Sequence, residues 1–93
     1  MTQRLLWRAA ALADLKQHRA WLSSLEGAKP DRIVLRIRAA AQSLLLLGDI
    51  GRPSVTFGVR ELSVRSAPYV IVYRPIHNGF EILAVFHTAQ QRR

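Results

Sequence analysis

The sequence predicts a single α+β domain, with helices in the first half of the chain and strands in the second half. Its 93 residues suit one domain with a small core. Apolar residues follow a helical period up to about residue 48, and alternating, β-branched segments follow them. We therefore expect the order β-α-α-β-β-β over residues 1–93, with a helical hairpin packed on a twisted antiparallel sheet.

The first two elements are predicted to be a short strand and a helix. Arg4 to Trp7 is the strand candidate, and Ala9 to Leu25 is the helix candidate, with Gly27 as its stop. Apolar residues recur in the helix at intervals of three and seven, which is typical of a buried face. These residues are Leu12, Leu15, Leu22 and Leu25, with Ala11 and Trp21 beside them.

A second helix is predicted between Pro30 and Gly48. Proline is favoured in the first turn of a helix, and glycine is common just after its end. One apolar stripe runs along this segment and consists of Ile33, Ile37, Ala40, Ala41, Leu44 and Leu45. Because only a few residues separate the two helices, they are expected to form an antiparallel hairpin.

The second half is predicted to be a loop followed by a three-stranded meander. Glycine and proline mark Asp49 to Gly58 as a loop. Asn78-Gly79 is a strong hairpin signal, because both residues accept a positive φ. In the last strand, alternation predicts that Ile82, Ala84 and Phe86 share one face. The three strand candidates are Val59 to Val64, Tyr69 to Arg74 and Phe80 to Phe86.

The charge balance is strongly basic. Fourteen lysines and arginines stand against six acidic residues, which gives a net charge of +8. Such a balance indicates an anionic partner, which could be a nucleic acid, a membrane surface or an acidic protein. The alternative is a surface charge that serves solubility alone.

Composition also bears on the cellular location of the protein and on the presence of disulfides or membrane segments. The chain has no cysteine, so no disulfide framework is possible. It has no apolar run near the roughly 20 residues of a membrane helix and no signal-peptide pattern at its start. We expect a cytoplasmic protein without membrane contact.

No cofactor or metal is predicted. His18, His77 and His87 have no ligand-like spacing, and no cysteine assists them. Glu61 is a possible general base, but a carboxylate on a strand is more often solvated or paired with a cation.

Metal-free RNA cleavage is the catalytic alternative that the residues allow. It needs groups that bind phosphate and move protons. The candidates are Arg60, Arg65, Arg74 and His87. Without further information we favour arginines that face solvent or pair with Glu61 and Glu81 across strands. We also favour His87 as a hydrogen-bonded structural residue.

Three segments of the second half carry a recognisable pattern. They read VRELSV at 59–64, PYVIVYR at 68–74 and EILAVFH at 81–87. In order and spacing they resemble the C-terminal sheet of ParE-type toxins of the RelE/ParE superfamily. Ala10 to Leu15 with Trp21-Leu22 is similar to that family's first helix, and Gly51-Arg52-Pro53 falls at its glycine-containing loop.

The resemblance implies a toxin of a type II toxin–antitoxin pair. Its cognate antitoxin would be acidic toward the C-terminus, would fold on the toxin in a hetero-oligomer, and would neutralise it. The other half of the antitoxin would bind operator DNA, so the toxin would meet that DNA only through its partner.

The superfamily divides by target, and several positions favour the ParE branch. RelE-like members cut mRNA on the ribosome, whereas ParE-like members poison DNA gyrase. Val70 and Thr88 stand at or near positions where RelE-like ribonucleases carry arginine, and their lysines fall near Glu61 and Ser63. Their terminal tyrosine has no counterpart before Arg93. We therefore expect gyrase poisoning without catalysis by this chain. The alternatives are an mRNA endonuclease and an inactive remnant that only binds antitoxin.

Surface contacts to partners are predicted at a small set of basic and aromatic residues. The set is Trp21, Arg36, Arg60, Arg74, Arg92 and Arg93. Trp7, Trp21 and Phe57 are expected in the core, with the alternative that one of them is an exposed anchor covered only in the complex.

Overall fold

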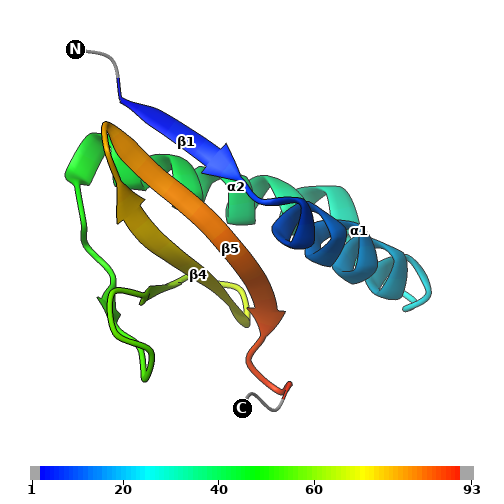
Figure 1. The fold of residues 1–93 in the computed structure, drawn as a ribbon. Helices are drawn as coiled ribbons and strands as arrows, with labels where there is room; N and C mark the ends of the chain where they lie inside the picture. The colour runs from blue at the N-terminus through cyan, green and yellow to red at the C-terminus, as the bar shows by residue number, and fades with distance from the viewer. Residues whose placement is uncertain (1–2, 91–93) are drawn as a thin grey trace.

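The computed structural model describes residues 3–90 and confirms the α+β fold. Both helices lie on one face of a five-stranded sheet (Figure 1). The predicted order is confirmed, with one short strand added inside the predicted loop. The elements are β1 (Arg4–Trp7), α1 (Ala9–Ser23), α2 (Pro30–Leu47), β2 (Arg52–Pro53), β3 (Arg60–Ser63), β4 (Tyr69–Ile76) and β5 (Gly79–His87).

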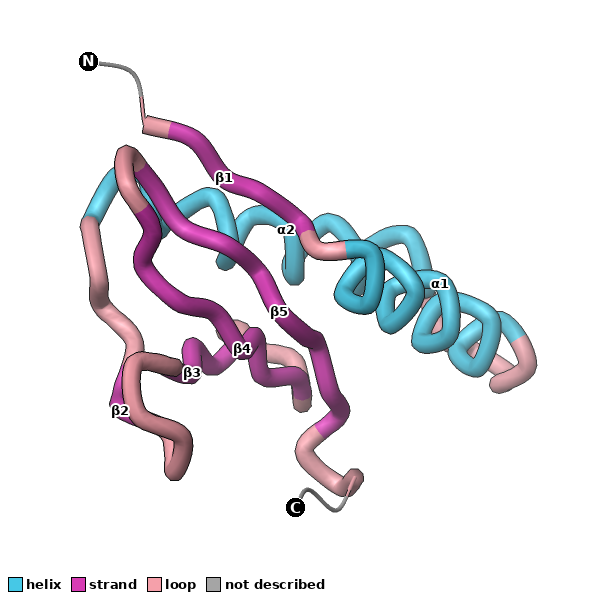
Figure 2. Tube along the Cα trace, viewed as in Figure 1, coloured by secondary structure: helices cyan, strands magenta, loops and turns pink. Residues whose placement is uncertain are grey.

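The sheet is mixed and not antiparallel throughout. Its strand order is β1-β5-β4-β3-β2 (Figure 2). Strands β3 to β5 form the predicted antiparallel meander, and the unpredicted β2 pairs antiparallel with β3. Strand β1 pairs parallel with β5. A parallel pair needs a long crossover connection. Here the helical hairpin and strands β2 to β4 form the connection between β1 and β5. The alternation of four residues in β1 could not reveal that the strand pairs in the parallel direction.

A bulge in β5 changes which of its side chains reach the core. Val85 pairs with Ile71, and Ile82 pairs with Tyr73, although simple alternation puts Ile82 and Val85 on opposite faces. The register shifts between Val72 and Tyr73, so one residue of β5 is unmatched and the alternation resets. The predicted face of Ile82 with Ala84 and Phe86 was therefore wrong.

The stripe on α2 is confirmed as the helical side of the core. Ile37, Ala41 and Leu44 are fully buried, and Ile33, Ala40 and Leu45 pack partly buried beside them. They meet the sheet face that carries Tyr69, Ile71 and Tyr73. This packing of one stripe on one face forms the single core of the domain.

The buried face of α1 differs from the prediction. Its buried residues are Ala11, Leu15, His18 and Leu22. Leu12 and Leu25 are exposed, because the helix turns its alanine and histidine toward β5 and ends at Ser23, before the predicted boundary. The predicted face was right for Ala11, Leu15 and Leu22 and missed His18, because an apolar pattern gives no reason to bury a histidine.

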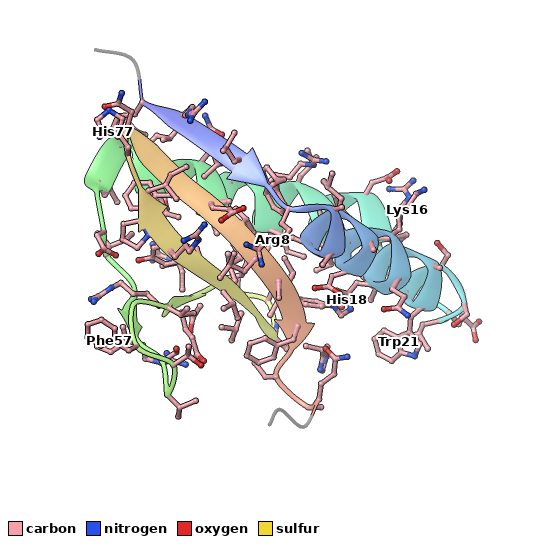
Figure 3. The ribbon with its side chains drawn as sticks, in the orientation of Figure 1. Arg8, Lys16, His18, Trp21, Phe57 and His77 are labelled. Carbon is pink, nitrogen blue, oxygen red and sulfur yellow. The ribbon has the colours of Figure 1, made fainter. Side chains whose placement is uncertain are left out.

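The three large aromatic residues expected in the core have different environments. Trp7 packs partly buried against the core, with the Arg38 guanidinium carbon 5.5 Å from the centre of its ring. Trp21 is half exposed on α1, and Phe57 is fully exposed on the β2–β3 loop (Figure 3). The core expectation was wrong for Trp21 and Phe57. The Trp21 ring lies edge-on to His87 and stays half exposed, and Phe57 lies on an exposed loop. Neither helix within residues 3–90 is long and apolar enough to span a membrane.

Candidate functional site

The four residues considered for RNA cleavage do not come together. Arg60 and Arg74 lie toward one end of β4, and Arg65 and His87 lie toward the other. His87 pairs with Tyr69, five residues before Arg74, which corresponds to roughly 17 Å along a strand. No single phosphate could contact all four side chains.

Arg60 is part of a polar clamp that holds the loop after α2. Its Nε lies 2.9 Å from Asp49 Oδ1, and its Nη2 donates to the Gly51 carbonyl at 2.7 Å. The Gly51 N–H donates to Tyr73 Oη at 2.8 Å, and the Tyr73 hydroxyl donates to Asp49 Oδ1 at 2.5 Å. Burial, followed by the bond to Asp49, raises the pKa of Tyr73. Arg60 is thus engaged in structure.

Arg74 is also paired, as the pattern of acids on neighbouring strands suggested. Its Nε donates to Glu81 Oε1 at 2.7 Å, and Arg8 reaches the same oxygen at 3.4 Å (Arg8 is labelled in Figure 3). The hydrogen bond from Arg74 lowers the pKa of Glu81, and the charge of Arg8 adds to that effect. The three side chains form an ion-pair group in which the arginines are exposed and Glu81 is partly buried.

Replacement of Arg74 by glutamine is expected to raise the pKa of Glu81 toward its ordinary value, because the largest cause of the lowering is removed. A lowered folded-state pKa stabilises the protein above the unfolded carboxyl pKa, and this contribution is lost as the pH falls through the folded value. Stability of the variant should therefore depend less on pH below about 4.5. Carbon NMR titration of the Glu81 carboxyl measures the shift. Arg65→Gln is the control, and an equal change in both variants would contradict the assignment.

Glu61 is buried and paired with an arginine. Of the two alternatives considered for this carboxylate, exposure to solvent was wrong and pairing with a cation is confirmed. The residue is 5% exposed, and Arg52 Nη2 lies 3.2 Å from its Oε1. Strands β2 and β4 flank it in the sheet. β2 was missed in the sequence because proline and glycine mark this stretch as a loop.

The other predicted contact residues are scattered. Arg36 is exposed and donates to the Ser66 carbonyl at 3.0 Å, near exposed Arg65 in the β3–β4 turn. Arg92 and Arg93 lie outside the described residues. Val70 is buried and Thr88 is exposed. Within residues 3–90 no group of three or more histidines or acids is placed to hold a metal ion.

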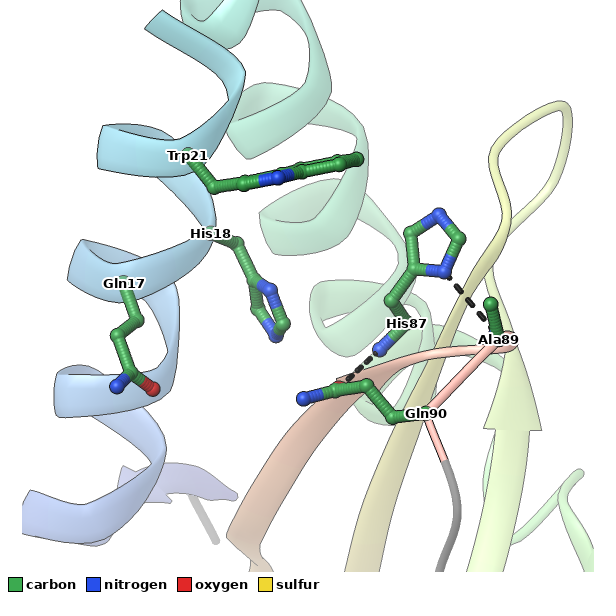
Figure 4. A pocket seen from close by; sticks show the side chains of 6 residues that line it. All are labelled: Gln17, His18, Trp21, His87, Ala89 and Gln90. Carbon is green, nitrogen blue, oxygen red and sulfur yellow. Dashed lines mark hydrogen bonds between the residues drawn. The ribbon is translucent and has the colours of Figure 1, made fainter. Parts of the chain in front are cut away.

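A pocket at the end of the sheet gathers aromatic and polar side chains. Its volume is about 410 Å³, and it lies between α1 and the end of β5 (Figure 4). We call it the His18–His87 pocket; its lining residues are Gln17, His18, Trp21, His87, Ala89 and Gln90.

Both histidines of this pocket are fixed by hydrogen bonds. His18 Nε2 donates to the Val85 carbonyl at 2.8 Å. The Ala89 N–H donates to His87 Nδ1 at 3.0 Å, which confirms His87 as hydrogen-bonded. The ring of Tyr69 packs edge-on against both, with centroids 4.9 Å and 5.1 Å away. Sequence reasoning missed this pocket because its halves lie at opposite ends of the chain.

Comparisons with known proteins agree with this architecture. The sequence-family model for the ParE toxin of the type II toxin–antitoxin system parDE matches residues 5–92. Y4kP, a toxin candidate of Sinorhizobium fredii (strain NBRC 101917 / NGR234), is 35% identical over 89 residues, which cover 96% of this chain and 92% of Y4kP.

Two solved structures share the fold. A chain of the chromosomal ParDE system from P. aeruginosa has a TM-score of 0.84 at 27% identity, over 92% of this chain and 96% of that one. A chain of the RelBE2 toxin–antitoxin complex from Mycobacterium tuberculosis has a TM-score of 0.65 at 22% identity, over 94% and 99%. The second likeness concerns the fold alone. With a family model that covers nearly all of the sequence, the chain belongs to the ParE toxins of type II toxin–antitoxin systems, within the RelE/ParE superfamily.

Proposed function

We propose that this ParE-family toxin stops growth by binding DNA gyrase in the cytoplasm and trapping it on cleaved DNA. Gyrase supplies the chemistry of DNA cleavage, and the toxin acts by binding. Membership of the ParE family is the observation that carries this proposal. The dispersal of Arg60, Arg74 and His87 over two ends of the sheet supports it against RNA cleavage.

The proposed neutralising partner is an antitoxin with an acidic segment. A net charge of +8 favours association with such a segment. Exposed apolar side chains, including Leu46 and Phe57, offer contacts that a folded partner would bury. Operator DNA would be bound by the antitoxin and not by this chain.

The test mixes the purified toxin with gyrase, ATP and supercoiled plasmid, and resolves the DNA after treatment with detergent and protease. Linear plasmid should accumulate, because a trapped cleavage complex releases broken DNA when gyrase is digested. Adding the antitoxin encoded beside the toxin should suppress the linear product. Reactions without toxin and without gyrase are the controls.

Each other outcome counts against the proposal and identifies a different function. Unchanged DNA with a toxin preparation that still stops growth would contradict gyrase poisoning and favour cleavage of ribosome-bound mRNA. In that case Arg74→Ala and His87→Ala should abolish cleavage. A folded protein that leaves both growth and DNA unchanged would indicate a remnant that only binds antitoxin.

A further inference from the structure

The His18–His87 pocket has the size of a small-molecule site and plays no part in the gyrase proposal. Its volume of about 410 Å³ falls within the range of known ligand pockets. One wall comes from α1, with Trp21 and His18, and the other from the end of β5, with His87 and Gln90 (Figure 4). The walls are tied together, because His18 bonds to the backbone of Val85 in β5.

The hydrogen bonds that fix the histidines also determine which donor and acceptor atoms remain available in the pocket. Because His18 Nε2 donates to a carbonyl, the neutral ring keeps Nδ1 as an acceptor. Because His87 Nδ1 accepts the Ala89 N–H, the neutral ring carries its proton on Nε2 as a donor. Gln90 accepts the His87 N–H at 2.7 Å through Oε1, which leaves its amide nitrogen as a donor. Within residues 3–90, His18 Nδ1, His87 Nε2 and the Gln90 amide nitrogen make no hydrogen bond, so they are available to a ligand.

An exposed aromatic surface lies beside these polar groups. The Trp21 indole is 51% exposed, and its ring centre lies 5.8 Å from that of His87. Tyr69 backs both histidines, and its hydroxyl is buried without a hydrogen-bond partner within residues 3–90. A half-exposed indole beside hydrogen-bonding groups is a suitable surface for stacking a flat ring.

A ligand for this pocket must be flat and must carry both donors and acceptors. An apolar side chain from a protein partner would leave His18 Nδ1, His87 Nε2 and the Gln90 amide nitrogen without partners, which is costly where water is displaced. A metal ion is disfavoured, because the lining contains no carboxylate. Nucleobases combine a stacking face with a mixed hydrogen-bonding edge, and the net charge of +8 attracts their phosphates.

We propose that the His18–His87 pocket binds a nucleobase, stacked near Trp21 and hydrogen-bonded by His18, His87 and Gln90. The base could belong to a free nucleotide or to an unpaired position in a nucleic acid. The proposal does not depend on gyrase, since binding is measured with the toxin alone.

Fluorescence of Trp21 provides the test. The chain has only two tryptophans, so Trp7→Phe leaves Trp21 as the sole reporter. Titration with AMP, GMP, CMP and UMP should give saturable quenching by at least one of them. Ribose 5-phosphate, which lacks a base, should give none. If circular dichroism shows that Trp7→Phe alters the fold, histidine NMR signals of the unsubstituted chain replace fluorescence.

Variants separate pocket binding from general attraction of anions. His87→Ala and Gln90→Ala should each weaken nucleotide binding about tenfold, the effect of losing a hydrogen bond worth roughly 1.4 kcal/mol. His77→Ala is the matched control, because this exposed histidine lies in the β4–β5 turn, away from the pocket (Figure 3). Gln90 is exposed, so its replacement should not disturb folding.

A single-stranded oligodeoxynucleotide distinguishes the two sources of the base. Binding at least ten times tighter than that of the best mononucleotide would indicate a nucleic acid, and equal binding a free nucleotide. The proposal is overturned if no nucleotide quenches saturably, if His87→Ala and Gln90→Ala bind like His77→Ala, or if ribose 5-phosphate binds equally well. It is also overturned if N-acetyl-phenylalanine amide binds more tightly than every nucleotide, because that result would identify an anchor for a protein partner.

Discussion

Replacement of Gly79 by alanine is expected to destabilise the protein by about 3–4 kcal/mol, because the new methyl group would collide with β1. A Cβ atom at this position would lie 1.8 Å from the Arg4 carbonyl oxygen and under 3 Å from two other backbone atoms of Arg4. Backbone atoms cannot rotate away, so β1 must leave the sheet. The bond from the Arg4 N–H to the Asn78 carbonyl, 2.8 Å long, would be lost with it.

Urea denaturation of the variant measures this loss, and hydrogen exchange of the β1 amides locates it. Gly58→Ala is the matched control. Gly58 has a φ of +79° but open space where the Cβ would lie, so only conformational strain of about 1–2 kcal/mol is expected. Equal losses in the two variants would show that strain, and not the contact with β1, determines the effect.

Replacement of Leu44 by alanine should cost about 3 kcal/mol, because it opens a cavity between α2 and the sheet. Leu44 is 0% exposed and belongs to the core cluster with Ile37 and Ile71. Leu46 lies two residues later on the same helix and is 84% exposed, so Leu46→Ala should change stability by at most about 0.5 kcal/mol.

The pair Leu44→Ala and Leu46→Ala removes the same atoms from the same helix, so helix propensity changes equally in both. Thermal and urea denaturation should give the same difference of about 2.5 kcal/mol between them. A similar cost in both would mean that Leu46 is covered in solution, for example by a second copy of the chain. Sedimentation of each variant would detect that copy.

The elements of the fold could be predicted wherever a local signal was strong. Asn78-Gly79 forms the expected turn, with Asn78 at a φ of 60°. The apolar stripe of α2 faces the core because six residues on a regular helix define one direction. β1 has only four residues, so its pairing with β5 depends on the path of the whole chain and not on its own pattern.

The candidate site was less accessible to sequence reasoning, because its parts are close only in the folded chain. Asp14 accepts the Val85 N–H at 2.8 Å, although the two residues are 71 positions apart. His18 lies on the buried face of α1, where a pattern of large apolar residues gives no reason to place a histidine. Glu61 is buried because β2 and Arg52 flank it, and β2 has no signal of its own in the sequence.

Among the strands within residues 3–90, β5 is the last to be synthesised, yet β1 and α1 depend on it. Within the described residues, β5 is the only strand that pairs with β1. Asp14 and His18 of α1 are hydrogen-bonded to the backbone of Val85 in β5. These are contacts of high sequence separation, which form late and slow folding. While the nascent chain lacks β5, β1 has no strand to pair with and α1 lacks its hydrogen bonds to Val85. Translation therefore has to reach the end of β5 before a complete toxin surface exists, and prematurely terminated chains are expected to be inactive.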